Sequence, residues 1–169
     1  MKGFPLNRII LLIALALVVR AVLNYTPPVQ SLVVGDPPPA FSVSVDNKPV
    51  DIETFKGAPL VIFFFANWCP CSHDSAPFVI QAAKEFEKNG LKVVAVGIMD
   101  SEEELRKFTA KHALPFPVVY DSKGEVAGKY GVVTTPSSIF IGRDWKVASI
   151  LVGKIKTYGS LLERVKPLL

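Results

Sequence analysis

The most restrictive feature of the sequence is an unbroken apolar run, Pro-Leu-Val-Ile-Phe-Phe-Phe, at residues 59–65. A strand with one face in water alternates apolar and polar residues. A run without any polar residue therefore predicts a central strand that is buried on both faces. The segment 91–98 is nearly as apolar and predicts a second buried strand. Two such strands need covering layers on both sides of their sheet, which indicates an α/β domain.

Further elements are predicted around these two strands. Apolar residues at helical spacing follow the first run as far as Asn89–Gly90, and Ser101 with Glu104 forms a capping box for a helix to about His112. Alternation and turn residues predict a hairpin at 41–50, a strand at 116–120, a short helix at 125–130, a closing hairpin at 137–142 and 147–152, and a last helix capped by Thr157. Alternating strands and helices that end in an antiparallel hairpin indicate a mixed central sheet.

The N-terminal residues have a different character from the rest. An apolar run from Ile9 to Val19 lies between Arg8 and Arg20, and no basic residue follows until Lys48. We expect an uncleaved single-pass signal anchor at 1–25 with the remainder outside the cytoplasm, although so short a run also fits a cleaved signal peptide. The proline-rich segment 26–40 predicts an extended stalk. One domain at 41–169 then remains.

The charge of the chain argues against a nucleic-acid partner. The formal net charge is +4, from 19 basic and 15 acidic residues, but Lys2, Arg8 and Arg20 lie in the N-terminal segment. The remainder carries 16 basic residues (19 minus 3) against 15 acidic ones, which is not the basic surface that nucleic-acid binding requires. Both cysteines lie in one motif, so they do not form the disulfide framework of a small secreted domain.

The cysteines Cys69 and Cys71 lie where the first buried strand becomes a helix. Unpaired N–H groups and the helix dipole at such a junction favour a thiolate and lower a cysteine pKa from ~8.5 to about 3.5–7.5. Pro70 suits the first helical position, which makes Cys69 the non-helical cap residue and the predicted nucleophile. Residues two apart on a helix point to nearly opposite faces, so whether Cys71 reaches Cys69 to form a disulfide stays open.

Neighbouring residues have two interpretations each. His73 follows Cys69 by four residues and either tunes the pKa of the thiol or is a partly exposed polar residue. Trp68 either packs over the sheet or offers an apolar surface to a partner. His112, near a predicted helix end, is interpreted as structural.

Four segments together resemble the membrane-anchored TlpA/redoxin branch of the thioredoxin-like thiol-disulfide oxidoreductases. They are VGDPPPAF (34–41), FKGAPLVIFFFANWCPC (55–71), FPVVYDSKGEVAGKYGV (116–132) and TTPSSIFIGRDWKV (134–147). The Trp-Cys motif after an apolar strand, combined with a later Thr-Pro, is specific as a pair. The resemblance implies a three-layer thioredoxin-like fold with an N-terminal β-hairpin.

The resemblance also implies roles for individual residues. Cys69 matches the nucleophile, whereas Thr135 and Pro136 match a cis-proline loop that, with Trp68, contacts substrate. Pro77 matches a family proline and fixes the register, so that Ser72 occupies the position of the usual resolving cysteine. Ser75 stands where many members carry an acidic residue.

The expected function is extracytoplasmic thiol–disulfide exchange with partner proteins through Cys69, with Cys71 or an external thiol resolving the mixed disulfide. By resemblance to relatives in cytochrome maturation or periplasmic disulfide reduction, electrons are expected from a membrane thiol relay, and no cofactor is expected. The alternative is a Sco-like copper chaperone that holds Cu(I) with Cys69 and Cys71, either with or without His73. A peroxidase is disfavoured, because the threonine such enzymes place three residues before the cysteine is Ala66 here.

Overall fold

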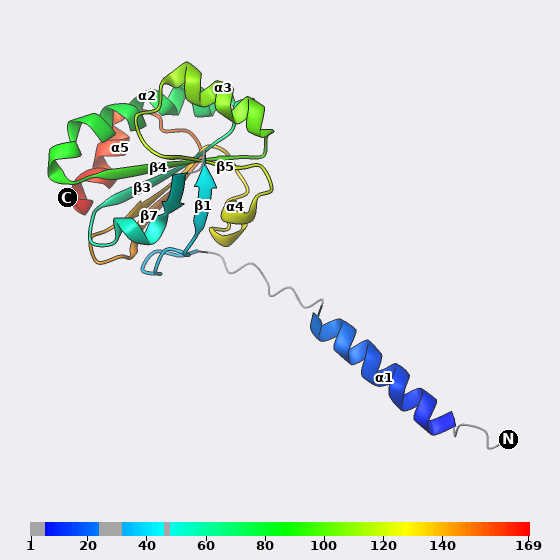
Figure 1. Cartoon of the computed structure of the whole chain (residues 1–169). Helices are drawn as coiled ribbons and strands as arrows, with labels where there is room; N and C mark the ends of the chain where they lie inside the picture. The colour runs from blue at the N-terminus through cyan, green and yellow to red at the C-terminus, as the bar shows by residue number, and fades with distance from the viewer. Residues whose placement is uncertain (1–5, 24–31, 46–47) are drawn as a thin grey trace.

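The computed structural model describes residues 6–23, 32–45 and 48–169 (Figure 1). The helices are α1 (Leu6–Leu23), α2 (Pro70–Glu85), α3 (Glu102–His112), α4 (Glu125–Lys129) and α5 (Tyr158–Val165), with short 3-10 turns η1 (Ile52–Phe55), η2 (Glu87–Asn89) and η3 (Lys166–Leu168). The strands are β1 (Ser42–Val45), β2 (Lys48–Asp51), β3 (Leu60–Phe65), β4 (Lys92–Ile98), β5 (Val118–Asp121), β6 (Ser137–Ile141) and β7 (Val147–Val152). The predicted elements of the domain are confirmed, and most ends differ by one or two residues. Helix α2, however, ends at Glu85 rather than at the predicted Asn89–Gly90, and the η2 turn follows it.

The central sheet has the strand order β5-β4-β3-β6-β7, and β1 pairs with β2 in a separate hairpin. Strands β3, β4 and β5 run parallel, whereas β6 runs antiparallel to β3 and β7 antiparallel to β6, so the predicted mixed sheet and N-terminal hairpin are confirmed. Every residue of β3 is buried, because this strand lies in the middle of the sheet with a layer on each face. This layout brings the C-terminal ends of β3 and β4 and the start of β6 to one edge.

The two faces of the sheet have separate apolar cores, which gives the three-layer arrangement. Helices α2, α3 and α5 cover one face, where Val79, Phe108 and Leu161 share an apolar core with Phe63. The hairpin, η1 and α4 cover the other, where Phe41, Val126 and other apolar side chains form the second core (Figure 1). The alternate side chains of β3 enter opposite cores, which is why this strand needs an apolar residue at each position.

Part of the predicted stalk packs on the domain. Residues 26–31 lie outside the described residues, but Gly35 N and Asp36 O bond Val147 on the edge of β7, each over 2.8 Å. The Tyr130 hydroxyl donates to the carbonyl oxygen of Pro39 at 2.8 Å. Residues 35–39 of the predicted stalk thus contact the domain, because the backbone of this segment pairs with an edge strand that the sequence could not place.

The N-terminal helix α1 carries apolar side chains, and those of residues 10–20 are exposed. Residues 1–5 and 24–25 of the predicted anchor lie outside the described part of the chain. Within the described residues, none of the helices combines the length and the apolar character needed to cross a membrane.

Candidate active site

Cys69 lies at the junction that the sequence predicts. Strand β3 ends at Phe65, and after three residues Cys69 forms the N-cap of α2 in an extended conformation (φ −91°, ψ 109°). Pro70 is the first helical residue, which it suits because its fixed φ is helical and its missing N–H has no partner there in any case. Cys69 is buried, with 7% of its surface exposed, so its sulfur lies against the helix terminus rather than in water.

The pKa of Cys69 is lowered despite this burial. Burial by itself raises the pKa, but hydrogen bonds from the Ser72 backbone, the Ser72 and Thr135 hydroxyls and the Cys71 backbone lower it and prevail. The protonated thiol donates to the Thr135 carbonyl oxygen at 3.4 Å. Within the described structure, the buried Thr135 hydroxyl has no other hydrogen-bond partner. It is therefore available to donate to the sulfur once Cys69 ionises. The site therefore stabilises a thiolate.

The loop before β6 completes the site from the other side. The Thr135–Pro136 peptide bond is cis, as the resemblance implies. It lies beside Cys69 because β6 runs antiparallel to β3, and the register pairs Ser137 with Phe64 near the end of β3. Cys69 and Thr135, which are 66 residues apart in the chain, therefore meet at one edge of the sheet.

Ser72 and Cys71 have opposite surroundings. Ser72 is fully buried beneath Cys69, and its oxygen also accepts from Ala66 N at 3.3 Å. Cys71 is exposed, and both cysteines are free thiols. The Cys69 sulfur thus contacts Ser72 and Thr135, and the second thiol is exposed to solvent.

Trp68 is tied to the neighbouring strand. Its indole Nε1 donates to the Met99 carbonyl oxygen at 2.9 Å, while 58% of Trp68 and 54% of Met99 stay exposed. Met99 has φ 58°, which is unusual for a residue with a side chain and turns the chain just after β4. Met99 was not predicted as a site residue. The sequence could have indicated it, because Met99 directly follows a strand parallel to β3, and the C-terminal ends of adjacent parallel strands lie at the same edge of the sheet.

His73 is directed away from the sulfur. Its Nε2 lies 2.7 Å from the Asn67 carbonyl oxygen, and its Nδ1 lies 2.8 Å from Nε2 of His112. Asn67 is also held by Asp100, which accepts from its backbone N at 3.1 Å, and by Glu104, which accepts from its side-chain amide at 2.7 Å. From the sequence, Glu104 was predicted only in a capping box and His112 only in a structural role. Their contacts with this loop depend on the packing of α3, so no local pattern in the sequence could indicate them.

The geometry gives no support to a copper site. Cys69 is buried, Cys71 points into solvent, and both His73 nitrogens are engaged by Asn67 and His112. In the part of the chain that the structure describes, no three His, Cys, Asp or Glu side chains are grouped so that they could hold a metal ion.

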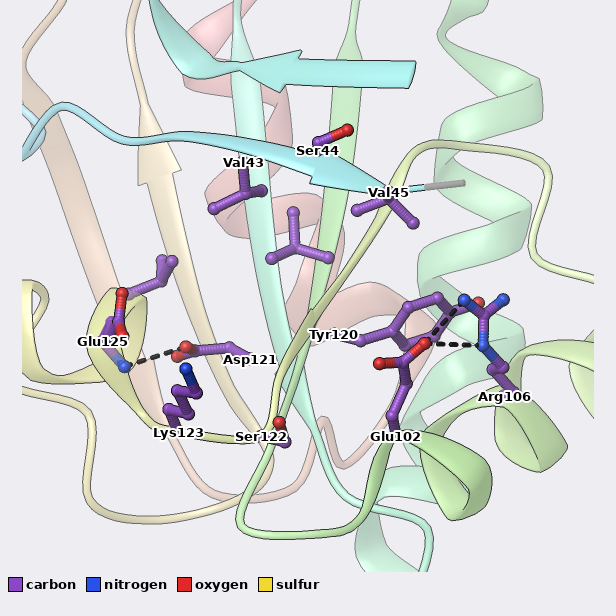
Figure 2. A pocket seen from close by; sticks show the side chains of 12 residues that line it. Val43, Ser44, Val45, Glu102, Arg106, Tyr120, Asp121, Ser122, Lys123 and Glu125 are labelled. Carbon is purple, nitrogen blue, oxygen red and sulfur yellow. Dashed lines mark hydrogen bonds and ion pairs between the residues drawn. The ribbon is translucent and has the colours of Figure 1, made fainter. Parts of the chain in front are cut away.

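A separate cavity of about 290 Å³ lies between β1, the end of β5 and the start of α3 (Figure 2). Three of its charged side chains are engaged: Arg106 bonds Glu102 at 2.7 Å, and the buried Asp121 accepts from the backbone of Glu125 at 2.8 Å. None of the residues that line it is a predicted site residue. The predicted site residues therefore lie outside this cavity.

Comparison with known proteins finds a matching family model and several similar chains. A family model described as the AhpC/TSA family matches residues 34–150. Thiol-disulfide oxidoreductase ResA of Bacillus cereus is 26% identical over 156 residues, covering 90% of each chain, and that of Oceanobacillus iheyensis is 29% identical over 155 residues, covering 88% of this chain and 80% of the relative. A Chlorobium tepidum crystal structure described as a thiol:disulfide interchange protein DsbE superposes with a TM-score of 0.77 at 29% identity, covering 82% of this chain and 99% of the other. The predicted thioredoxin-like α/β fold is confirmed by this superposition.

Proposed function

We propose that this chain, which belongs to the AhpC/TSA family, is a thiol-disulfide oxidoreductase in which Cys69 exchanges disulfides with partner proteins. The observation that carries the proposal is the buried Cys69 sulfur at the start of α2, whose pKa is lowered by hydrogen-bond donors against the opposing effect of burial. The relatives named thiol-disulfide oxidoreductase ResA and the DsbE structure support the same class of reaction.

The reaction begins with the Cys69 thiolate. It attacks one sulfur of a partner's disulfide, a mixed disulfide forms, and the partner's other sulfur leaves as a thiolate that takes a proton from water. A second thiol then attacks the mixed disulfide, which releases the reduced partner or regenerates Cys69. In the full cycle the partner disulfide gains two electrons and two protons, and the resolving thiols lose them.

We infer that the resolving thiol comes from outside the Cys69 pocket. The residues that touch the Cys69 sulfur are Ser72 and Thr135, neither of which can form a disulfide, and Cys71 is exposed on the helix surface. An external dithiol, such as a membrane thiol relay, would supply the electrons. Cys71 would take part only after the first turn of α2 rearranges.

Exposed apolar side chains around the site suit a protein substrate. Trp68 and Met99 lie on one side of the Cys69 loop, and Val133, which is 81% exposed, lies just before the cis-proline loop on the other. Together with Thr135 and Pro136, they would hold an extended segment of the partner across the sulfur. The expected substrate is a disulfide flanked by apolar residues.

We place the domain outside the cytoplasm, linked to the membrane. The support is the apolar segment between Arg8 and Arg20, whose described side chains are exposed, and the absence of basic residues from there to Lys48. Cell fractionation with alkaline extraction tests this proposal, since a protein in the cytoplasmic fraction would refute it.

The experiment that tests the activity compares insulin reduction by the full chain with that of Cys69→Ser and Cys71→Ser, with an external dithiol as electron donor. Cys69→Ser should abolish the activity, whereas Cys71→Ser should keep most of it, because resolution is external. Cu(I) titration of the same proteins is the control for the chaperone alternative, and we expect no tight binding that depends on both cysteines. Full activity of Cys69→Ser would contradict the proposal.

A further inference from the structure

A row of hydrogen bonds runs from the end of α3 to the loop that carries Cys69. His112 Nε2 lies 2.8 Å from His73 Nδ1, and His73 Nε2 lies 2.7 Å from the Asn67 carbonyl oxygen. The carbonyl oxygen only accepts, so His73 bears a proton on Nε2. When both rings are neutral, His73 accepts at Nδ1 from the Nε2–H of His112. The pair therefore points its donors toward the loop.

The hydrogen bond from the His73 side chain to the Asn67 carbonyl oxygen closes a ring that contains the backbone of residues 67–73, and hence Cys69. Asn67 precedes Cys69 by two residues and His73 follows it by four, so the bond between them spans Cys69. Inside the ring lie the Cys71 and Ser72 backbone groups that stabilise the thiolate. Fixing the ring fixes the direction in which these N–H groups point at the sulfur.

We propose that His112, acting through His73, is a positioning residue for the Cys69 thiolate, and that double protonation of this histidine pair releases the Cys69 loop in mildly acidic solution. The inference rests on the proposed function, because it concerns the reactivity of the same thiol. It assigns no contact with substrate to either histidine.

The hydrogen bond between the two imidazole rings tolerates one added proton but not two. A single added proton leaves a donor on one facing nitrogen and an acceptor on the other. A second proton places N–H groups on both nitrogens, which the 2.8 Å separation does not allow. Burial, His73 and Lys111 together lower the pKa of His112, in agreement with this limit. The other charged groups that face the pair are Asp74 on α2, together with Asp100 and Glu104, which hold Asn67.

Packing alone is the competing explanation. The rings of His73 and His112 lie 4.8 and 4.5 Å from that of Phe108, so the pair also fills space between α2 and α3. Two variants separate the explanations. His112→Phe keeps an aromatic ring but has no donor. His112→Gln loses the ring but keeps an amide that can donate to His73 or turn to accept from it.

The test uses the full chain in detergent with Cys71→Ser as the parent, so that Cys69 is the only thiol. Iodoacetamide alkylation rates are measured between about pH 5 and 9. One ionising thiol gives a slope of at most about one in log rate against pH, so loop release should make the parent steeper below about pH 6.5. His112→Gln should keep the neutral rate within about twofold and lose the extra steepness. His112→Phe should react about fivefold more slowly at neutral pH, which is the rate equivalent of one hydrogen bond.

Imidazole NMR gives a second readout that packing would not change. The chain has only two histidines, so both signals assign directly. We expect each signal of the parent to report two coupled steps and the single signal of His112→Gln to report one. Independent titration of the two rings, or a wild-type alkylation profile in His112→Phe, would overturn the inference. An unreactive Cys69 in the parent would instead refute the proposed function, and the NMR result would still decide the pairing.

Discussion

Replacing Ser72 with alanine tests how the site lowers the pKa of Cys69. The Ser72 side chain is fully buried and has two partners: its hydroxyl donates to the Cys69 sulfur, and its oxygen accepts from Ala66 N at 3.3 Å. A hydrogen bond to a charged group contributes about 1.5–3 kcal/mol. Since one pKa unit corresponds to about 1.4 kcal/mol, Ser72→Ala should raise the pKa of Cys69 by about one to two pH units.

The same substitution should also destabilise the fold. It leaves the buried Ala66 N–H without its acceptor, which costs about 1–3 kcal/mol. The pKa is measured from the ultraviolet absorbance of the thiolate in a Cys71→Ser background, and the free energy of unfolding from urea denaturation. Both quantities come from one protein, so the effect on the thiol is separated from the effect on stability.

Ser75→Ala is the matched control. Ser75 is a fully buried serine on the same helix, and its hydroxyl donates to the Cys71 carbonyl at 2.7 Å and accepts from Ile155 N at 3.1 Å. It should lose a similar amount of stability and leave the pKa of Cys69 where it was. An unchanged Cys69 pKa in Ser72→Ala, or an equal rise in Ser75→Ala, would refute the assignment of the thiolate donors.

Three further predictions concern the same site. Ser72→Cys in a Cys71→Ser background should place a thiol in contact with Cys69, so that the oxidised protein holds an intramolecular disulfide, seen as protection of both sulfurs from alkylation in mass spectrometry; two alkylated sulfurs would contradict it. Met99→Ala should raise KM for a protein disulfide by roughly fivefold and leave the reaction with a small disulfide unchanged, because Met99 extends the exposed surface beside Trp68; a loss with both substrates would show general damage instead. Because the folded-state pKa of Cys69 is lowered, the unfolded chain binds more protons than the folded protein between that pKa and about 8.5. The stability of the wild type relative to Cys69→Ser should therefore rise with pH through this window, and this gain should be lost as pH falls through the folded pKa. Urea denaturation that shows no such trend would contradict this prediction.

Much of the fold followed from local patterns in the sequence. The unbroken apolar run at 59–65 is β3, buried at every position, because a strand between two apolar layers accepts no polar side chain. Pro70 fixed the start of α2, and with it the placement of Cys69 at a helix terminus. The cis-proline loop came from the resemblance, and its place beside Cys69 follows from the antiparallel pairing of β3 with β6.

The sequence by itself thus determined which cysteine lies at a helix N-terminus, since that terminus is a local feature that a few consecutive residues specify. Tertiary structure alone decided what surrounds that thiol. His112 meets His73, Met99 meets Trp68, and residues 35–36 pair with Val147, all through contacts between segments far apart in the chain. Such contacts depend on how helices and strand ends pack at one edge of the sheet. No periodicity within a single segment encodes which distant segment it will contact.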